Sequence, residues 1–298
     1  MKDRSHLLTE QRLPESMALD TMAVEDAVVL MNAQDAAAVA AVARERAAIA
    51  AVVTLVADAL RAGGRLFYFG AGTSGRLGVL DAAECPPTFR SDPEMVQGVI
   101  AGGDAAMFKA QEGAEDRAGD GAAAVEARGV GPRDVVIGIA SGGTTPFVHG
   151  ALGRAAERGA KTVFLTCVQP FPGEPKADVI IRPLTGPEVI TGSTRLKAGT
   201  ATKLVLNTIS TLAMVRLGKV YQNLMVDLRA SNQKLQDRAV RIIATLTGLA
   251  AHKSNDLLRA ADGHVKLAVV MHERAVGVEQ AKELLAAAGG NLRAAIGR

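Results

Sequence analysis

Short apolar runs without polar alternation recur through the middle of the chain. They are Arg65–Phe69, Met95–Ala101, Asp134–Ala140, Lys161–Val168 and Ala177–Pro183. Such runs are typical of strands that are covered on both faces. Between and after them, Asp104–Arg117, Pro146–Arg158 and Arg195–Leu217 have helical spacing of their apolar residues. The alternation predicts an α/β fold, in which a parallel five-stranded sheet is flanked by helices.

Both ends of the chain have helical rather than strand-like patterns. Asp35–Arg61 is rich in alanine with apolar residues at three and four spacings, and we expect one long helix with Asp35 as its cap. After Leu217 only short helical patterns follow, with breaks at Gly248, Gly263, Gly277 and Gly289. We therefore expect an N-terminal helical segment (1–55), a central α/β domain (56–222) and a small C-terminal helical module (223–298).

Composition narrows the class of protein. With 298 residues, 48% hydrophobic and 22% charged, the chain has enough apolar side chain to fold. Its net charge of +3 is spread without blocks of one sign and aromatic residues make up 3%, so we expect no nucleic-acid partner. Apolar stretches such as Ala47–Ala57 fall short of a membrane span, and Met1–Ser16 lacks the apolar core of a secretory signal. Two cysteines and no short-spaced ligand cluster predict a cytoplasmic protein without a structural metal.

The first predicted strand is followed by Gly70–Gly75, which has the form G-x-G-x-x-G. This pattern alone is a weak sign of a dinucleotide site. Pro86 and Pro87 are expected to stop the next helix early, and Asp104 comes 34 residues after Gly70 instead of about 20, so both further requirements of that site fail. What remains are two hydroxyls, Thr73 and Ser74, at a helix N-terminus, where they either bind a phosphate or cap the helix.

Two more hydroxyl-rich loops favour the phosphate. Ser141-Gly142-Gly143-Thr144-Thr145-Pro146 follows a buried strand and opens a helix, and Thr191-Gly192-Ser193-Thr194-Arg195 precedes another. In open parallel sheets, ligands bind along the edge formed by the carboxyl ends of the strands. We therefore expect a phosphate-binding pocket that includes Thr73, Ser74, Ser141, Thr144, Thr145 and Ser193.

Longer motifs carry a resemblance to a known family. They are Gly70–Gly78, Asp81–Phe89 with its Glu84-Cys85-Pro86-Pro87, Glu112–Asp116, Thr191–Thr200 and Asn223–Leu228. Through them the chain resembles the sugar isomerase domain proteins and, among these, the N-acetylmuramic acid 6-phosphate etherases. The resemblance covers the chain from about Arg12 to the C-terminal module and implies a flavodoxin-like sugar isomerase fold.

The resemblance also implies an activity. The family's enzymes are homodimeric, cofactor-independent lyases that remove D-lactate from the 3-ether of N-acetylmuramic acid 6-phosphate and leave N-acetylglucosamine 6-phosphate, in cell-wall recycling. Their two catalytic glutamates correspond to Glu84 and Glu115, and their phosphate loops to Thr73 with Ser74 and to Ser141–Thr145. One departure concerns the second loop, where Gly142 stands at the usual serine position. Either Ser141 supplies the hydroxyl through a shifted loop, or Thr144 and backbone N–H groups replace it.

The two glutamates would divide acid and base work. We expect Glu84 to be the acid because Cys85, Pro86 and Pro87 flank it with apolar groups, and Glu115 to be the base; the reverse assignment stays open. A continuous helix from Gly75 to Glu84 would place this carboxylate roughly 14 Å from the phosphate loop. We therefore expect that the helix is short or bent, or that Glu84 serves the neighbouring subunit.

Two other functions remain open from the sequence. A sugar phosphate isomerase would use the same pocket with one glutamate base. A phosphosugar sensor resembling the glucokinase regulatory protein shares several of the motifs, although that protein carries two such domains and this chain has room for one.

Overall fold

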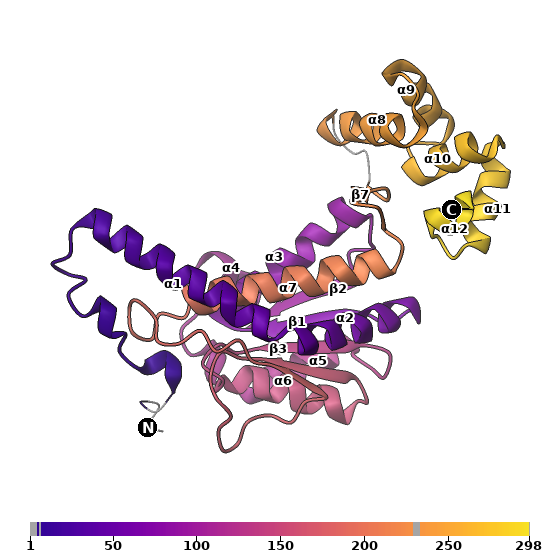
Figure 1. Cartoon of the computed structure of the whole chain (residues 1–298). Coiled ribbons are helices and arrows are strands. Elements are labelled where there is room, and N and C mark those ends of the chain that lie inside the picture. Colours follow the sequence, from indigo (N-terminus) through magenta and orange to yellow (C-terminus); the bar gives the residue numbers. More distant parts are fainter. Residues whose placement is uncertain (1–4, 6, 229–232, 298) are drawn as a thin grey trace. The chain divides into compact units, whose positions relative to one another are not determined.

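Five parallel strands form one sheet in the computed structural model, which describes residues 5, 7–228 and 233–297 (Figure 1). The strand order is β2-β1-β3-β4-β5, as in a flavodoxin-like doubly wound sheet. The strands are β1 Leu66–Gly70, β2 Val96–Ile100, β3 Val135–Ile139, β4 Lys161–Leu165 and β5 Val179–Ile181. All five lie within the predicted runs or one residue beyond them, so the predicted fold class is confirmed.

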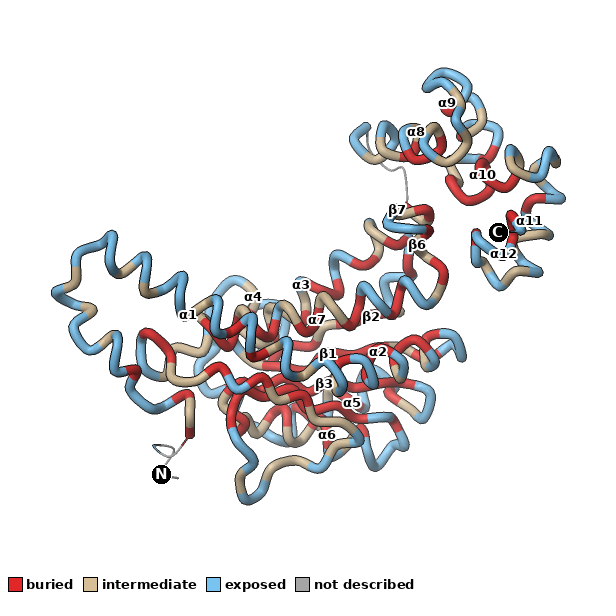
Figure 2. Tube along the Cα trace, viewed as in Figure 1, coloured by how far each residue is buried: buried red, intermediate tan, exposed pale blue. Residues whose placement is uncertain are grey.

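The sheet is covered on both faces, which is why its strands read as unbroken apolar runs (Figure 2). Phe67 and Phe69 of β1 pack with residues of α6 on one face. On the other face, a Cβ on Gly78 of α3 would lie 2.8 Å from the Cβ of Tyr68. Alternate residues of one strand thus contact helices on opposite sides.

The helices fall into two compact units. Unit 1 comprises Met1–Ala83 with Glu94–Ser210, and unit 2 comprises Glu84–Pro93 with Thr211–Arg298. The helices of unit 1 are α1 Val24–Arg44, α2 Arg46–Arg61, α4 Ala105–Phe108, α5 Ala118–Ala127 and α6 Pro146–Glu157, with short 3-10 turns at Leu8–Glu10, Pro14–Ser16 and Ala114–Asp116. Two helices, α3 Gly72–Phe89 and α7 Lys197–Arg216, begin in unit 1 and end in unit 2.

The single N-terminal helix predicted from Asp35 is wrong. Helix α1 begins at Val24, so Asp35 lies inside it, and α2 follows after a break at Glu45. At this break, the Glu45 carboxylate accepts a hydrogen bond from the backbone N–H of Arg182 at 3.0 Å. Alanine-rich sequence alone does not indicate such a contact.

The predicted helix Asp104–Arg117 is also wrong. Only α4 and the 3-10 turn Ala114–Asp116 are helical there, and α5 follows where no helix was expected. Gly113, between the two, has a φ of +74°, a left-handed conformation that glycine adopts without strain. This irregular segment places Glu115 on a short turn beside the sheet edge.

Unit 2 is built from small helices around its own core. Its elements are a hairpin of β6 Val220–Tyr221 and β7 Leu224–Met225, followed by α8 Gln233–Thr247, α9 Ala251–Ala260, α10 Val265–Arg274, α11 Val278–Ala287 and α12 Leu292–Ile296. The helices are separated at Gly248, Gly263, Gly277 and Gly289, as predicted. Buried Lys266 donates to Asp227 at 2.9 Å and to the carbonyl of Gly290 at 2.8 Å, which ties α10 to the segments on either side.

Candidate functional site

The first glycine motif joins strand and helix with almost no loop. Strand β1 ends at Gly70 and α3 begins at Gly72. A Cβ on Gly70 would lie 2.7 Å from the backbone nitrogen of Gly75, and a Cβ on Gly75 would lie 2.6 Å from Ile100. These glycines therefore permit close packing of the first helical turn against the sheet edge, and this places Thr73 and Ser74 at that edge.

The first and second predicted loops meet there. The hydroxyls of Ser74 and Ser141 lie 3.4 Å apart, although the two residues come from different strand ends. Ser141 is 8% exposed, while Ser74 is half-buried. Of the two alternatives for the second loop, this geometry favours Ser141 as the hydroxyl that faces the first loop.

The rest of the second loop surrounds this contact. Thr144 and Thr145 are half-buried, and Thr145 is the N-cap residue of α6 without a side-chain capping bond. A Cβ on Gly142 would lie 3.7 Å from the hydroxyl of Thr9, which comes from the N-terminal segment. That buried hydroxyl makes no hydrogen bond within the described part of the chain. The N-terminal segment thus packs directly beside the second loop.

The third loop approaches from α7. A Cβ on Gly199 would lie 3.6 Å from the Thr73 methyl group, so the first turn of α7 packs against the first turn of α3. Ser193 is half-buried just before this turn, and its backbone N–H donates to the carbonyl of Ile190. All six predicted phosphate-site residues thus lie in unit 1, in three loops that follow the sheet edge or pack on it.

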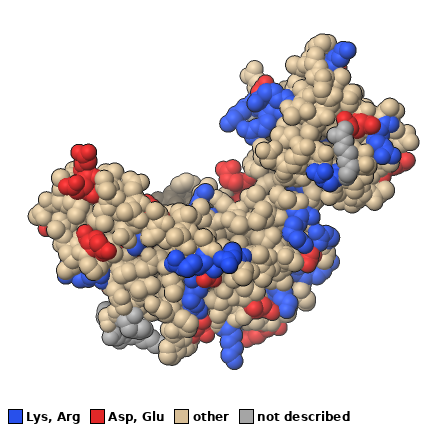
Figure 3. Space-filling view, viewed as in Figure 1, with Lys and Arg blue, Asp and Glu red and all other residues tan. Residues whose placement is uncertain are grey.

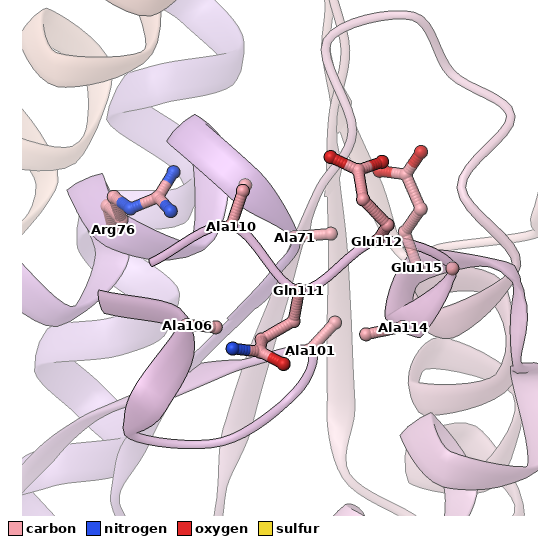
Figure 4. Close-up of a pocket in the computed structure, with 11 residues that line it drawn as sticks. Ala71, Arg76, Ala101, Ala106, Ala110, Gln111, Glu112, Ala114 and Glu115 are labelled. Atoms are coloured by element: carbon pink, nitrogen blue, oxygen red, sulfur yellow. The ribbon is translucent and has the colours of Figure 1, made fainter. Parts of the chain in front are cut away.

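A cavity of about 120 Å³ opens beside the first loop and is lined by Ala71, Gly72, Arg76, Glu112 and Glu115 with several small residues. Figure 4 shows Glu112 and Glu115 pointing in the same direction at one side of this cavity, with Arg76 at the other. Both glutamates are exposed. Glu115 therefore lies where a sugar held by the first loop could reach it.

Glu84 lies on a longer helix than the sequence predicts. Helix α3 is continuous through Pro86 and Pro87 to Phe89, so the predictions of an early stop and of a short helix are wrong. Neither proline can donate the backbone hydrogen bond of its turn, and the helix nevertheless continues to Phe89. At 1.5 Å per residue, Glu84 is roughly 16 Å along the helix from Thr73. Glu84 is also exposed, in contrast to the apolar surroundings expected for an acid.

A buried charged pair stands behind the third loop. Glu188 is 0% exposed and accepts hydrogen bonds from the backbone N–H groups of Lys197 and Ala198, both at 2.9 Å. Burial raises the pKa of Glu188, against the effect of these hydrogen bonds and the Lys197 charge. Burial likewise lowers the pKa of Lys197, whose Nζ donates to Gln34 of α1 at 2.6 Å. Glu188 thus accepts hydrogen bonds from the first backbone N–H groups of α7. These hydrogen bonds fix the start of α7, and with it the end of the third loop.

Sequence reasoning missed several of these residues. Arg76 was visible as the residue three positions after Thr73, which in a helix places it on the same face. Glu112 was visible beside Glu115. Nothing in the sequence pattern indicated the positions of Thr9 or Glu188, because both depend on tertiary contacts.

The N-terminal helix differs from expectation in one further respect. By length and composition alone, α1 is apolar enough to cross a membrane, which the sequence reading did not anticipate. In the structure, Ala38 and Ala41 are buried and Gln34 contacts Lys197 of α7, so the second half of α1 packs on the rest of unit 1. On the face shown in Figure 3, Lys and Arg are interspersed with Asp and Glu.

Family models match both parts of the chain. Residues 48–156 match the N-terminal sugar isomerase (SIS) domain of the glucokinase regulatory protein, and residues 222–277 match the C-terminal lid domain of that protein. A solved structure of the Vibrio vulnificus NanR protein complexed with ManNAc-6P is 16% identical, with a TM-score of 0.43, and the match covers 79% of this chain and 74% of that one.

Full-length relatives are much closer. The N-acetylmuramic acid 6-phosphate etherase of Synechocystis sp. is 53% identical, and that of Nostoc sp. is 54% identical. Each match covers 99% of this chain, and the matches cover 97% and 96% of the two relatives. The chain belongs to the N-acetylmuramic acid 6-phosphate etherase family. The Synechococcus elongatus etherase, 55% identical, extends the same match. Membership of the etherase family accounts for the SIS fold and for the helical C-terminal unit together.

Proposed function

We propose that this protein is a lyase that cleaves the D-lactyl ether of N-acetylmuramic acid 6-phosphate and yields D-lactate and N-acetylglucosamine 6-phosphate. The observation that carries the proposal is the contact of Ser74 with Ser141 beside the cavity that Glu115 lines, in a member of the etherase family. Thr73, Ser74, Ser141, Thr144, Thr145 and Ser193 would bind the phosphate. Hydroxyls at helix N-termini suit a phosphate because they donate hydrogen bonds where the helix dipole favours negative charge.

The reaction follows from the chemistry of the open-chain sugar. Its aldehyde acidifies the proton on carbon 2, and a carboxylate can then remove this proton while an acid protonates the departing lactyl oxygen. Water adds to the resulting unsaturated aldehyde at carbon 3, and a proton returns to carbon 2. We assign the base to Glu115, on the cavity wall, and the acid to Glu84, and no metal or cofactor takes part.

The position of Glu84 on a continuous helix supports a site shared between two subunits. At 100° per residue, Thr73, Arg76, Leu80 and Glu84 lie on one face of α3, and Leu80 is 52% exposed at the middle of that face. If a second copy packs antiparallel about a two-fold axis near Leu80, Glu84 of each subunit lies beside Arg76 of the other. We therefore propose that the protein acts as a homodimer, in the cytoplasm where its phosphorylated substrate is found.

The decisive assay is release of D-lactate from N-acetylmuramic acid 6-phosphate, measured with D-lactate dehydrogenase. We expect release by the wild type, and a decrease of about 10²- to 10⁴-fold in Glu84→Gln and Glu115→Gln, with phosphosugar binding retained. Folded protein that binds the substrate without releasing lactate would overturn the activity.

A mixing experiment tests the shared site. If each site takes Glu84 from one subunit and Glu115 from the other, random mixing of the two inactive variants restores an intact site in half of the positions of each mixed dimer. Since about half of the dimers are mixed, the activity should recover to about a quarter of the wild-type value. No recovery despite subunit exchange would place both glutamates in one subunit.

A sensor function is the second candidate, because both family models are derived from the glucokinase regulatory protein. A sensor would bind phosphosugars without turnover. The lactate assay separates the two functions.

A further inference from the structure

Arg76 is the one positively charged side chain among the residues that line the cavity beside the first loop. The other charged groups there are the two carboxylates of Glu112 and Glu115. Figure 4 shows the Arg76 guanidinium on the opposite side of the cavity from these carboxylates. The cavity therefore has a cationic side and an anionic side.

The guanidinium is held in a fixed orientation. Its Nε donates to the carbonyl of Met107 at 3.0 Å, and its two Nη groups form no hydrogen bond within the described residues. A guanidinium anchored through Nε leaves a planar pair of N–H donors, which matches the two oxygens of a carboxylate. Thr73 lies one turn earlier on the same helix face, so this pair of donors is close to the proposed phosphate site.

The substrate proposed above has two anionic groups. One is the phosphate on carbon 6, and the other is the carboxylate of the lactyl group on carbon 3. The hydroxyl-rich loops provide for the first of these. The second must enter a cavity that already contains two carboxylates, and like charges there oppose its binding unless a cation compensates.

We propose that Arg76 binds the lactyl carboxylate and thereby determines that the enzyme acts on a carboxylate-bearing ether. This inference rests on the proposed etherase function. Arg76 holds one end of the leaving group, while Glu115 and Glu84 act on the carbon 2 proton and the ether oxygen. The carboxylate does not react: it leaves with D-lactate, so the free product competes for the same guanidinium.

The test compares the natural substrate with its lactyl amide, which has nearly the same shape and lacks the negative charge. We expect the wild type to prefer the acid by about 10- to 100-fold in kcat/KM, after correction for the difference in the intrinsic reactivity of the two ethers. Arg76→Ala should lose most of this preference, and Arg76→Lys should retain part of it. The expected loss lies mainly in activity on the acid, with little change on the amide.

Lys109 supplies a matched control. It is an exposed cation in the same segment as Met107, and it does not line the cavity. Lys109→Ala should leave the preference for the acid unchanged, which separates direct contact from a general effect of positive charge. Binding of both compounds to Glu115→Gln, with and without Arg76→Ala, gives the same comparison without turnover.

The outcomes are distinct. If the wild type releases no lactate, the etherase function fails. If the wild type is active and Arg76→Ala weakens acid and amide equally, Arg76 acts only by holding Met107 and this inference is wrong. The inference is also wrong if the variant retains the full preference, or if the wild type has none.

Discussion

Asp81 connects three elements of unit 1, and its substitution tests whether these connections stabilise the part of the fold that carries the candidate site. Its carboxylate accepts hydrogen bonds from the Tyr68 hydroxyl of β1 at 2.8 Å, and from Asn207 at 2.6 Å and Ser210 at 3.0 Å on α7. Tyr68, Asp81 and Ser210 are 0%, 5% and 4% exposed. Because Asp81 itself belongs to α3, the network fixes the position of the helix that carries Thr73, Arg76 and Glu84.

Asp81→Ala removes all three hydrogen bonds. A buried donor left without its acceptor costs about 1–3 kcal/mol, and bonds to a charged acceptor are at the upper end. The Ser210 hydroxyl can turn toward the carbonyl of Asn207, 3.4 Å away, and recover part of its loss. Asn207 is half-buried, so losing its hydrogen bond costs less free energy of unfolding than the loss at Tyr68. We therefore expect a loss of about 3–5 kcal/mol in the free energy of unfolding.

The measurement is urea unfolding followed by far-UV circular dichroism, with Tyr68→Phe in both backgrounds. In the wild type, Tyr68→Phe should cost about 1.5–3 kcal/mol, whereas in Asp81→Ala it should cost nothing and instead recover up to about 1–3 kcal/mol, because it removes the buried hydroxyl that has lost its acceptor. Asp58→Ala, which removes an exposed ion pair with Arg61, should cost less than about 1 kcal/mol. Equal costs of Tyr68→Phe in the two backgrounds would refute the network.

Three further predictions concern single groups. Ser74→Ala and Ser141→Ala should each weaken binding of N-acetylglucosamine 6-phosphate by about 10- to 100-fold in calorimetric titration, because each removes a hydroxyl from the proposed phosphate site; unchanged affinity would exclude that role. Burial raises the pKa of the Cys167 thiol to about 12, so at pH 8 it should react with iodoacetamide only upon unfolding, and mass spectrometry showing rapid labelling of native protein would contradict this. Burial alone would raise the pKa of Asp178, but hydrogen bonds from Thr162 and Lys161 outweigh it and lower that pKa, so the ionised carboxylate stabilises the fold at neutral pH. The stability advantage of the wild type over Asp178→Asn in urea unfolding should therefore be full above the ordinary pKa of 3.8 and shrink as the pH falls below it; a difference independent of pH would contradict the assignment.

The sheet could be predicted because each of its strands is enclosed between helices. Burial on both faces demands an unbroken apolar run, and such runs are visible in the sequence without knowledge of the partners. The breaks in unit 2 were equally visible, because Gly248, Gly263 and Gly289 adopt positive φ, which glycine allows at little cost. These features are local, and local patterns encode them.

Some contacts could not be predicted because they join distant segments. The Glu45 carboxylate at the end of α1 accepts a hydrogen bond from Arg182, and the Lys197 Nζ donates to Gln34. Lys266 likewise donates to Asp227 and to the carbonyl of Gly290. In each case a polar side chain satisfies a group far away in the sequence, and no periodicity indicates which group it will be.

Helix α3 shows how one local misjudgement hides the arrangement on which the proposed shared site depends. The spacing of Thr73, Arg76, Leu80 and Glu84 is plain in the sequence, but it means one shared face only if the helix continues through Pro86 and Pro87. With a helix assumed to stop or bend, Glu84 could be brought near its own phosphate loop, and the partner subunit was only one of several solutions. A helix that continues to Phe89 removes the solution in which it stops before Glu84. Glu84 is distant from the first loop of its own chain. In the proposed dimer, an antiparallel second copy centred on exposed Leu80 would bring Glu84 close to the first loop of the partner.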